Sequence, residues 1–250
     1  MSSLRAMNSA SDAPIQVFVL HVKKGYEARE QHMRSELAKH RMDADWVLDH
    51  DIPDLSAEFL AKWFRGDMQK PCAATSCAAK HLEAWQRLRK LGASGALVLE
   101  DDIFLDPNFR ASLQAILREA SDRHRLDGKP YVLSLENSLL RFVPKSERED
   151  GRWLYPQKLI RCAGAYYLSR EAAIAFTDRA AATGITGPAD WWMNEFFPAA
   201  IGLYWSHPTL AEQGSHNGLF KSGIDQKKQG FMRRVSWSVQ RWFKTRFRSK

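Results

Sequence analysis

The chain has 250 residues, 44% of them hydrophobic, and a formal net charge of +8. This composition is typical of a globular chain with one sizeable core, and it excludes a disordered or fibrous protein. No run approaches the roughly 18 apolar residues of a membrane-spanning helix. Residues 1–14 are small and polar, without the apolar segment of a signal peptide, so we expect a disordered lead-in. The three cysteines lack zinc-site spacing, and we interpret them as reduced thiols of a cytoplasmic protein.

Strand and helix patterns alternate along the chain from residue 15 onward. Short apolar, β-favouring runs predict strands at residues 15–20, 44–48, 96–105, 131–135 and 161–168. Apolar side chains at helical spacing predict helices at residues 26–39, 59–64, 75–88, 108–120 and 171–182. The polar run at residues 144–152 is typical of an exposed hairpin or loop. This alternation predicts an α/β sandwich with a largely parallel sheet.

The run A-L-V-L-E-D-D-I-F-L at residues 96–105 holds three adjacent carboxylates, Glu100, Asp101 and Asp102, which we call the acidic run. Such charges repel one another and are costly near a core unless something positive neutralises them. A Mg²⁺ or Mn²⁺ ion that holds a phosphorylated substrate would do so. Strand alternation places Glu100 and Asp102 on one face and Asp101 on the other. The alternative is an exposed acidic turn after a buried strand.

A predicted helix and a short glycine-containing linker lead directly into this run. We expect Thr75 or Ser76 to cap the helix, and Leu82, Trp85 and Leu88 to share one of its faces. The acidic run then stands at the carboxyl end of a strand. In open α/β sheets, ligands bind at that edge.

The helix and the acidic run together resemble glycosyltransferase family 25, the lipopolysaccharide and lipooligosaccharide glycosyltransferases related to the collagen galactosyltransferases. That family has a G-C-x-x-S-H-x-x-x-W helix followed by a strand that ends in E-D-D. The matching residues are Cys77, His81, Trp85 and the acidic run. The departures are Lys80 in place of serine and Ser76 in place of glycine.

Further segments resemble the same family in the same order. They are V-F-V-L-H-V at residues 17–22, Arg29 with Met33, C-A-G-A-Y-Y-L-S-R-E-A-A at 162–173, P-A-D-W-W-M at 188–193 and H-P-T-L-A-E-Q at 207–213. In the first segment, His21 stands where the family has asparagine. The resemblance covers residues 15–218. It implies the glycosyltransferase A fold, a Rossmann-like, mixed but mostly parallel sheet flanked by helices, in a catalytic domain at residues 15–225.

The resemblance also implies a metal-dependent, inverting transfer, with UDP-galactose as the donor and a lipid-linked lipooligosaccharide or lipopolysaccharide core as the acceptor. The leaving diphosphate needs charge stabilisation, which Mn²⁺ or Mg²⁺ held by carboxylates provides. We expect Asp102 to bind the metal ion and Glu100 to bind the metal ion or the donor ribose. For Asp101 two roles stay open, a contact with the donor sugar or the orientation of its neighbours. His21 and Arg29 are further candidates for donor binding, Arg29 through the diphosphate. A solvated helix face is the alternative for Arg29.

Inversion also requires a base that takes a proton from the acceptor hydroxyl. Asp190 is the candidate, because it matches the aspartate of the P-x-D motif. Its neighbours Trp191 and Trp192 offer flat apolar faces for a sugar and can raise the pKa of a carboxylate. The alternative for Asp190 is a helix N-cap, with both tryptophans in the core. Glu195 and Glu136 are the runner-up bases.

Three histidines complete the set of candidate residues. We interpret His81 as a buried, hydrogen-bonding side chain rather than a metal ligand. Either His207 or His216 would complete the shell of the metal ion. The sequence offers no spacing that chooses between them.

The excess of positive charge lies in the C-terminal segment. Residues 227–250 hold nine basic and no acidic residues, and the rest of the chain holds 28 basic against 29 acidic residues. As a helix, residues 226–250 would present apolar and aromatic side chains on one face and basic ones on the other. Such a helix is typical of a membrane-surface element, at about 1 kcal/mol per basic residue near an anionic leaflet. We therefore expect a peripheral location on the inner face of the cytoplasmic membrane.

Two other interpretations of this segment stay open. It could pack on the catalytic domain of the same chain, or it could bind single-stranded nucleic acid. Because the rest of the chain is nearly neutral, no nucleic-acid partner is expected. Two alternative function classes remain, a membrane-surface binding protein with a degenerate transferase domain and a nucleic-acid-associated enzyme. The intact acidic run argues against the first, and only the C-terminal segment suggests the second.

Overall fold

The computed structural model describes residues 15–220 together with Gln240 and Lys244. The lead-in expected at residues 1–14 and nearly all of the basic helix expected at residues 226–250 lie outside the described residues. Among the helices that are described, none is both long and apolar enough to cross a membrane.

Strands and helices alternate along the described chain. The strands are β1 (Gln16–Leu20), β2 (Asp45–Val47), β3 (Gly95–Glu100), β4 (Ile103–Leu105), β5 (Tyr131–Ser134), β6 (Leu154–Gln157), β7 (Ala165–Ser169), β8 (Gly202–Ser206) and β9 (Ala211–Gln213). The α-helices are α1 (Glu27–Lys39), α2 (Ala57–Trp63), α3 (Ala73–Leu91), α4 (Phe109–Asp127), α5 (Arg170–Thr183), α6 (Ala189–Met193) and α7 (Gly214–Asn217). Short 3-10 turns are η1 (Ile52–Asp54), η2 (Gly66–Gln69) and η3 (Lys145–Glu147).

Within the described residues, a seven-stranded sheet has the order β2-β1-β3-β7-β5-β8-β6. β1 pairs in parallel with β2 and β3, and β5 pairs in parallel with β8. β7 and β6 run antiparallel to their neighbours, so five of these seven strands point the same way. The expected mixed, mostly parallel sheet is confirmed. Because β1, β2 and β3 are parallel, their carboxyl ends meet at one edge.

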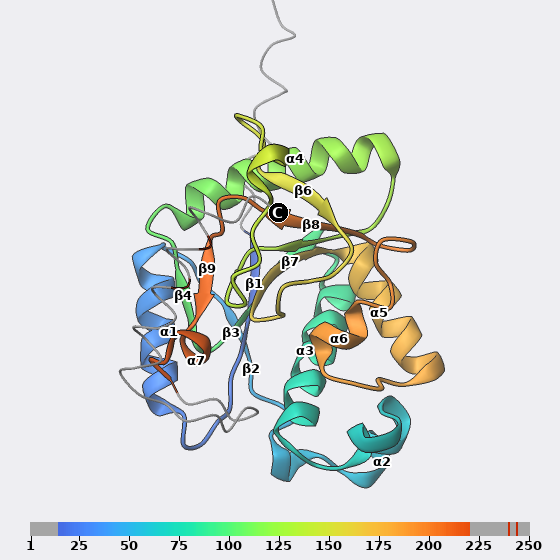
Figure 1. Cartoon of the computed structure of the whole chain (residues 1–250). Helices are drawn as coiled ribbons and strands as arrows, with labels where there is room; N and C mark the ends of the chain where they lie inside the picture. The colour runs from blue at the N-terminus through green and yellow to red at the C-terminus, as the bar shows by residue number, and fades with distance from the viewer. Residues whose placement is uncertain (1–14, 221–239, 241–243, 245–250) are drawn as a thin grey trace, which may run out of the picture.

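Helices cover both faces of the sheet, with α3, α5 and α6 on one side and α1 and α4 on the other (Figure 1). The side chains of β1 show how the two cores arise. Phe18 and Leu20 pack in the core with α3 and α5, whereas Val17 and Val19 pack in the core with α1 and α4. Since both faces of the central strands are buried, these strands are continuously apolar in the sequence.

The strand predicted at residues 96–105 is broken in two. β3 ends at Glu100, Asp101 and Asp102 form a turn, and β4 then leaves the main sheet to pair with β9. The predicted alternation of the three carboxylates across one strand is therefore wrong. The break arises because β4 pairs with β9 instead of continuing β3, so the chain turns at Asp101 and Asp102 and one guanidinium group, that of Arg29, reaches both carboxylates.

The predicted cap of the helix before the acidic run is also wrong. α3 begins earlier, with Cys72 at its N-cap position. Thr75 and Ser76 lie inside the helix, and their hydroxyl groups donate to backbone carbonyl groups of earlier segments, including that of His50. These bonds tie the start of α3 to the loop after β2.

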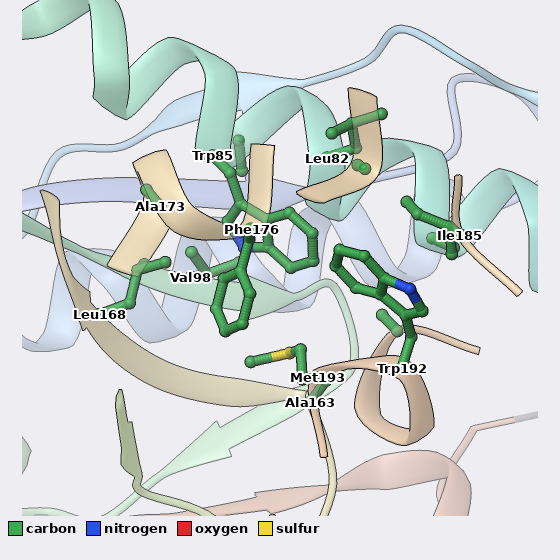
Figure 2. Close-up of a cluster of buried hydrophobic side chains, with 14 of the residues drawn as sticks. Leu82, Trp85, Val98, Ala163, Leu168, Ala173, Phe176, Ile185, Trp192 and Met193 are labelled. Carbon is green, nitrogen blue, oxygen red and sulfur yellow. The ribbon is translucent and has the colours of Figure 1, made fainter. Parts of the chain in front are cut away.

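An aromatic core holds α6 beside α3 and α5 (Figure 2). Trp85 is fully buried, and its ring centroid lies 4.8 Å from that of Phe176 and 6.0 Å from that of Trp192. Large buried aromatic side chains contribute much of the packing energy of a core. This packing fixes α6, and with it Asp190, near the acidic run.

Candidate active site

A cavity of about 500 Å³ opens where the carboxyl ends of β1 and β3 meet. The segment after β1, the turn η1, the start of α3 and the acidic run line it. The basic side chains in this lining are Lys23, Lys24, Arg29 and Lys80. The volume is in the range of small-molecule sites, and the basic groups suit an anionic ligand.

Asp101 is neutralised by two partners from the first strand–helix unit. Its Oδ2 lies 2.8 Å from Nδ1 of His21, and its Oδ1 accepts a 2.7 Å hydrogen bond from Nη1 of Arg29. The Arg29 side chain is only 13% exposed, so it does not lie on a solvated helix face. The structure thus brings His21, Arg29 and Asp101 together in the cavity wall. The guanidinium group supplies the positive charge that the acidic run requires.

Asp102 is the most deeply buried carboxylate of the acidic run. Its Oδ2 accepts a 2.9 Å hydrogen bond from the backbone N–H of Ser215, and Nη2 of Arg29 lies 3.9 Å away. Its Oδ1 is buried and has no hydrogen-bond partner among the described residues. Burial, with the charge of Glu100, raises the pKa of Asp102 to about 6. A buried carboxylate oxygen without a donor is suited to bind a cation.

The two oxygens of Glu100 face different neighbours. Oε2 accepts a 2.9 Å hydrogen bond from Nε2 of Gln213. Oε1 lies 3.6 Å from Nε2 of His81 and 3.7 Å from Sγ of Cys77. The Glu100 side chain is 25% exposed and lines the cavity. A ligand in the cavity can therefore reach the Glu100 carboxylate, while Gln213 holds one of its oxygens in place.

Asp190 lies in the first turn of α6, but Pro188 occupies the N-cap position. The alternative role as a helix N-cap is therefore wrong. Burial raises the pKa of Asp190, and the charge of Glu100 raises it further. Asp190 does not line the cavity, yet it is close enough to Glu100 for their charges to interact. Trp192 is in the core, whereas Trp191 is 71% exposed and offers its indole to solvent.

Residues 15–193 match the model of glycosyltransferase family 25, which is described as an LPS biosynthesis protein family. The chain belongs to glycosyltransferase family 25. The matched range contains α3, the acidic run and α6, and it ends before Gln213 and Ser215. The members of this family are glycosyltransferases, which join the sugar of a nucleotide-sugar donor to an acceptor.

The chain is similar to a curated protein in sequence and to a solved structure in fold. A protein of Anopheles gambiae described as a glycosyltransferase 25 family member is 25% identical over 128 residues, which are 50% of this chain and 20% of that protein. The matched part therefore spans a fifth of the length of this relative. A solved structure of a glycosyltransferase involved in the glycosylation of the major capsid of PBCV-1 is similar over 91% of this chain and 100% of its own, with 11% identity and a TM-score of 0.46.

Lys80, one of the departures from the family 25 motif, is buried in the cavity wall. Its Nζ lies 2.8 Å from Oδ1 of Asp51 and donates to the carbonyl oxygen of Asp49 at 2.7 Å. Burial lowers the pKa of Lys80, and the hydrogen bond to Asp51 opposes that effect. Because serine carries no charge, the Lys80–Asp51 pair gives this member of family 25 a charged wall on that side.

The runner-up bases lie outside the cavity lining. Glu136 is fully buried and accepts hydrogen bonds from the backbone N–H groups of Gly164 and Ala165. Burial raises the pKa of Glu136 to about 8. Glu195 is exposed, and its Oε1 accepts a hydrogen bond from Thr186. Glu136 therefore braces the loop before β7.

The three candidate histidines lie in different surroundings. His81 is fully buried, and its Nδ1 lies 2.9 Å from the Tyr166 hydroxyl, as a buried hydrogen-bonding histidine should be. His207 is held near β6, where its ring meets that of Tyr155, and burial lowers the pKa of His207 to about 4. His216 belongs to α7 and follows Ser215, which bonds to Asp102. Of the two candidate ligands, His216 is therefore the one whose chain neighbour contacts the acidic run.

Two residues that contact the acidic run, Gln213 and Ser215, are missing from the predicted site. Each lies 113 residues beyond its partner in the sequence. Gln213 ends the H-P-T-L-A-E-Q segment, and that motif is the available signal for it. Ser215 contributes only a backbone N–H, which no side-chain pattern reveals.

Proposed function

We propose that the protein is a metal-dependent, inverting glycosyltransferase. Its donor is a nucleotide sugar, with UDP-galactose as the first candidate, and its acceptor is the lipid-linked core of a lipooligosaccharide or lipopolysaccharide. Membership of family 25 and the description of that family support this proposal. The choice of galactose depends on the family resemblance alone.

The observation that carries the proposal is Oδ1 of Asp102, a buried carboxylate oxygen without a donor at the wall of the cavity. Asp102 and Glu100 would hold Mn²⁺ or Mg²⁺, since both offer the oxygen ligands that these ions prefer. A metal ion bound there supplies positive charge to the leaving diphosphate. His216 is the proposed additional ligand, because it follows the residue that bonds Asp102.

His21 and Arg29, which contact the acidic run directly, keep it in place and are the proposed donor-binding residues. His21 and Arg29 together hold both oxygens of Asp101, so this carboxylate cannot swing when a ligand enters. Arg29 also brings positive charge to within 3.9 Å of Asp102. A diphosphate in the cavity would meet this charge and that of the neighbouring lysines, which favours an anionic donor.

Asp190 is the proposed base, and it accepts the proton of the acceptor hydroxyl on a carboxylate oxygen. Its raised pKa makes its carboxylate a stronger base than that of an ordinary aspartate. The exposed indole of Trp191 stands beside it and provides an apolar face for the acceptor sugar. Trp192 anchors the helix from the other side, so the base is presented from a rigid element.

The decisive experiment is a panel of nucleotide sugars incubated with the full-length protein in Mn²⁺, in Mg²⁺ and in excess EDTA. We expect a UDP-sugar to be hydrolysed slowly in the presence of the metal ion and not in EDTA. A folded protein that neither binds nor hydrolyses any nucleotide sugar contradicts the proposal. If that protein still binds anionic vesicles, it is a membrane-surface protein with a degenerate transferase domain.

A further inference from the structure

A second group of metal-binding atoms lies beside the acidic run. Cys77 and His81 are four residues apart in α3, so their side chains project from the same face of the helix. Glu100 approaches them from the end of β3. Sγ of Cys77, Nε2 of His81 and a carboxylate oxygen of Glu100 all lie within 4.8 Å of one another.

One of these atoms lacks a partner although it is completely buried. Nε2 of His81 has no hydrogen bond among the described residues, and the side chain is 0% exposed. Oε1 of Glu100 lies 3.6 Å from this nitrogen, which is too long for a hydrogen bond in either tautomer of the ring. A buried polar atom of this kind is costly unless a ligand satisfies it.

The other ring nitrogen of His81 is already oriented. Nδ1 lies 2.9 Å from the Tyr166 hydroxyl, which also accepts a 2.9 Å hydrogen bond from Nε1 of Trp85. A histidine that binds a metal ion commonly donates its second N–H to an oxygen atom, which fixes the ring. Tyr166 can be that acceptor when a metal ion is bound; the lone pair of Nε2 then faces the side of Glu100, whose Oε1 lies 3.6 Å away.

We propose that Cys77, His81 and Glu100 form a binding site for Zn²⁺ at the edge of the cavity. Zinc–ligand bonds of about 2.0–2.3 Å in a tetrahedron place the ligand atoms about 3.4–3.8 Å apart. The observed 3.6 Å from His81 to Glu100 and 3.7 Å from Cys77 to Glu100 match that spacing. A thiolate and an imidazole select zinc over Mg²⁺ or Mn²⁺.

The fourth position of this zinc site opens to the cavity, because Cys77 and Glu100 both line it. In the free protein the Cys77 thiol donates a hydrogen bond to Oε1 of Glu100. When zinc binds, the sulfur–hydrogen bond breaks, a zinc–sulfur bond forms and the proton leaves to solvent. No electron is transferred in this step.

Zinc at this site binds the carboxylate of Glu100, which the proposed function assigns to the catalytic metal ion or the donor. We therefore expect zinc to inhibit transfer, and this part of the inference rests on the proposed function. Zinc binding itself does not depend on that activity, so it can be measured without any donor.

The test is a titration of the full-length, tag-free protein with ZnCl₂ in a calorimeter, and with Co²⁺ in an absorption spectrometer. We expect about one Zn²⁺ per chain and an absorption band of thiolate-to-cobalt charge transfer. Both should disappear in Cys77→Ser and persist in Cys72→Ser, the matched control, whose thiol is exposed and outside the cluster. Circular dichroism of Cys77→Ser verifies that the variant is folded.

Asp102→Asn separates this site from the acidic run as a whole. We expect it to keep the zinc stoichiometry and the cobalt band, because Asp102 is not a member of the cluster. Undiminished zinc binding in folded Cys77→Ser, or a wild-type cobalt complex without the thiolate band, overturns the inference. A protein that binds zinc through Cys77 but hydrolyses no nucleotide sugar supports this inference while contradicting the proposed function.

Discussion

Nε2 of Gln213 donates a 2.9 Å hydrogen bond to Oε2 of Glu100, and this bond joins β9 to the carboxyl end of β3. Gly164 makes the contact possible. A Cβ atom at Gly164 would lie 2.4 Å from Nε2 of Gln213, closer than any real contact allows. The carbonyl oxygen of Gly164 also accepts a 2.8 Å hydrogen bond from the backbone N–H of Glu100. Two distant segments therefore hold Glu100, one through its carboxylate and one through its backbone N–H.

Removal of this hydrogen bond should lower activity without unfolding the protein. Gln213→Leu keeps the size of the side chain and removes its donor, so Glu100 is no longer held toward the metal and donor. We expect a loss of about 10–100-fold in kcat/KM, the usual effect of a residue that orients a metal ligand. Steady-state kinetics at several Mn²⁺ concentrations would show the loss, together with a weaker apparent metal affinity.

Gly164→Ala tests the same contact from the other side. Its methyl group should displace Gln213 and give a similar loss of activity. The double variant should lose little more activity than either single variant, because both substitutions remove the same hydrogen bond between Gln213 and Glu100. Gly187→Ala is the control, since the added Cβ meets no atom closer than 4.0 Å. Fully additive losses would show that Gln213 and Gly164 act independently.

Asp102→Asn should give a folded protein with almost no transferase activity. The substitution keeps the shape of the side chain and its bond to Ser215, but removes the charge of the proposed metal ligand. We expect a decrease of about 10²-fold or more, the scale of losing a major electrostatic stabiliser. The rates of the variant and of the wild-type protein are measured in Mn²⁺ and in EDTA. A variant as active as the wild-type protein, or a wild-type protein that keeps its rate in EDTA, would rule out the metal assignment.

Asp190→Asn should abolish transfer to the acceptor and leave donor binding nearly unchanged, because only the proton-accepting group is lost. Calorimetry with the donor and Mn²⁺, alongside transfer assays, separates the two effects. Glu195→Gln is the matched control, since that carboxylate is exposed and outside the cavity lining. A parallel decrease in donor affinity would place Asp190 in the donor site, and an inactive Glu195→Gln would make Glu195 the base.

The rate of transfer should fall as the pH is lowered. The midpoint of this fall should lie at a higher pH than the pKa of an ordinary aspartate. Burial, with the charge of Glu100, raises the pKa of Asp190, and the base works only when ionised. The rate therefore rises with pH through that raised pKa. Glu100→Gln removes the neighbouring charge, so the acidic limb of the kcat profile should shift to lower pH while the overall rate falls. Profiles at saturating Mn²⁺ and donor measure this shift, and an unmoved limb would contradict it.

The sequence predicts β1, β2, β5 and β7, and it misses β6, β8 and β9. β1, β3 and β7 are buried on both faces, so each leaves an apolar run in the sequence. β6 lies at the edge of the sheet and contains Pro156, and β9 has only three residues, so neither was predicted. Local patterns give no signal for strands whose stability depends on a partner far away.

The same reason limits the prediction of the site. Glu100, Asp101 and Asp102 attract notice because adjacent charges are costly, whatever the fold around them. Their partners Gln213 and Ser215 come from a segment that only the pairing of β4 with β9 brings near. That pairing also turns the chain at Asp101, and the single strand predicted over residues 96–105 lacks this turn.

Deletion of residues 227–250 should separate membrane binding from catalysis. Within residues 15–220, the contacts described for the candidate site are made without this segment, so the catalytic part should stay folded and turn over a soluble acceptor analogue. The nine basic residues of the segment should carry the binding to anionic vesicles, which salt would weaken by screening. A vesicle co-sedimentation series in increasing NaCl measures that binding in the full-length and shortened chains.

The acceptor decides how the shortened chain is to be assayed. With a micellar lipid acceptor its rate should fall, because it no longer resides at the surface where the acceptor is concentrated, whereas the rate with a soluble acceptor should be retained. If the apolar side of the segment instead packs on the catalytic domain, deletion would expose core. The melting temperature would then fall by about 2–4 °C for each kcal/mol lost in a chain of this size, and the protein would aggregate. A large melting shift with vesicle binding unchanged would establish the packing role and exclude the membrane role.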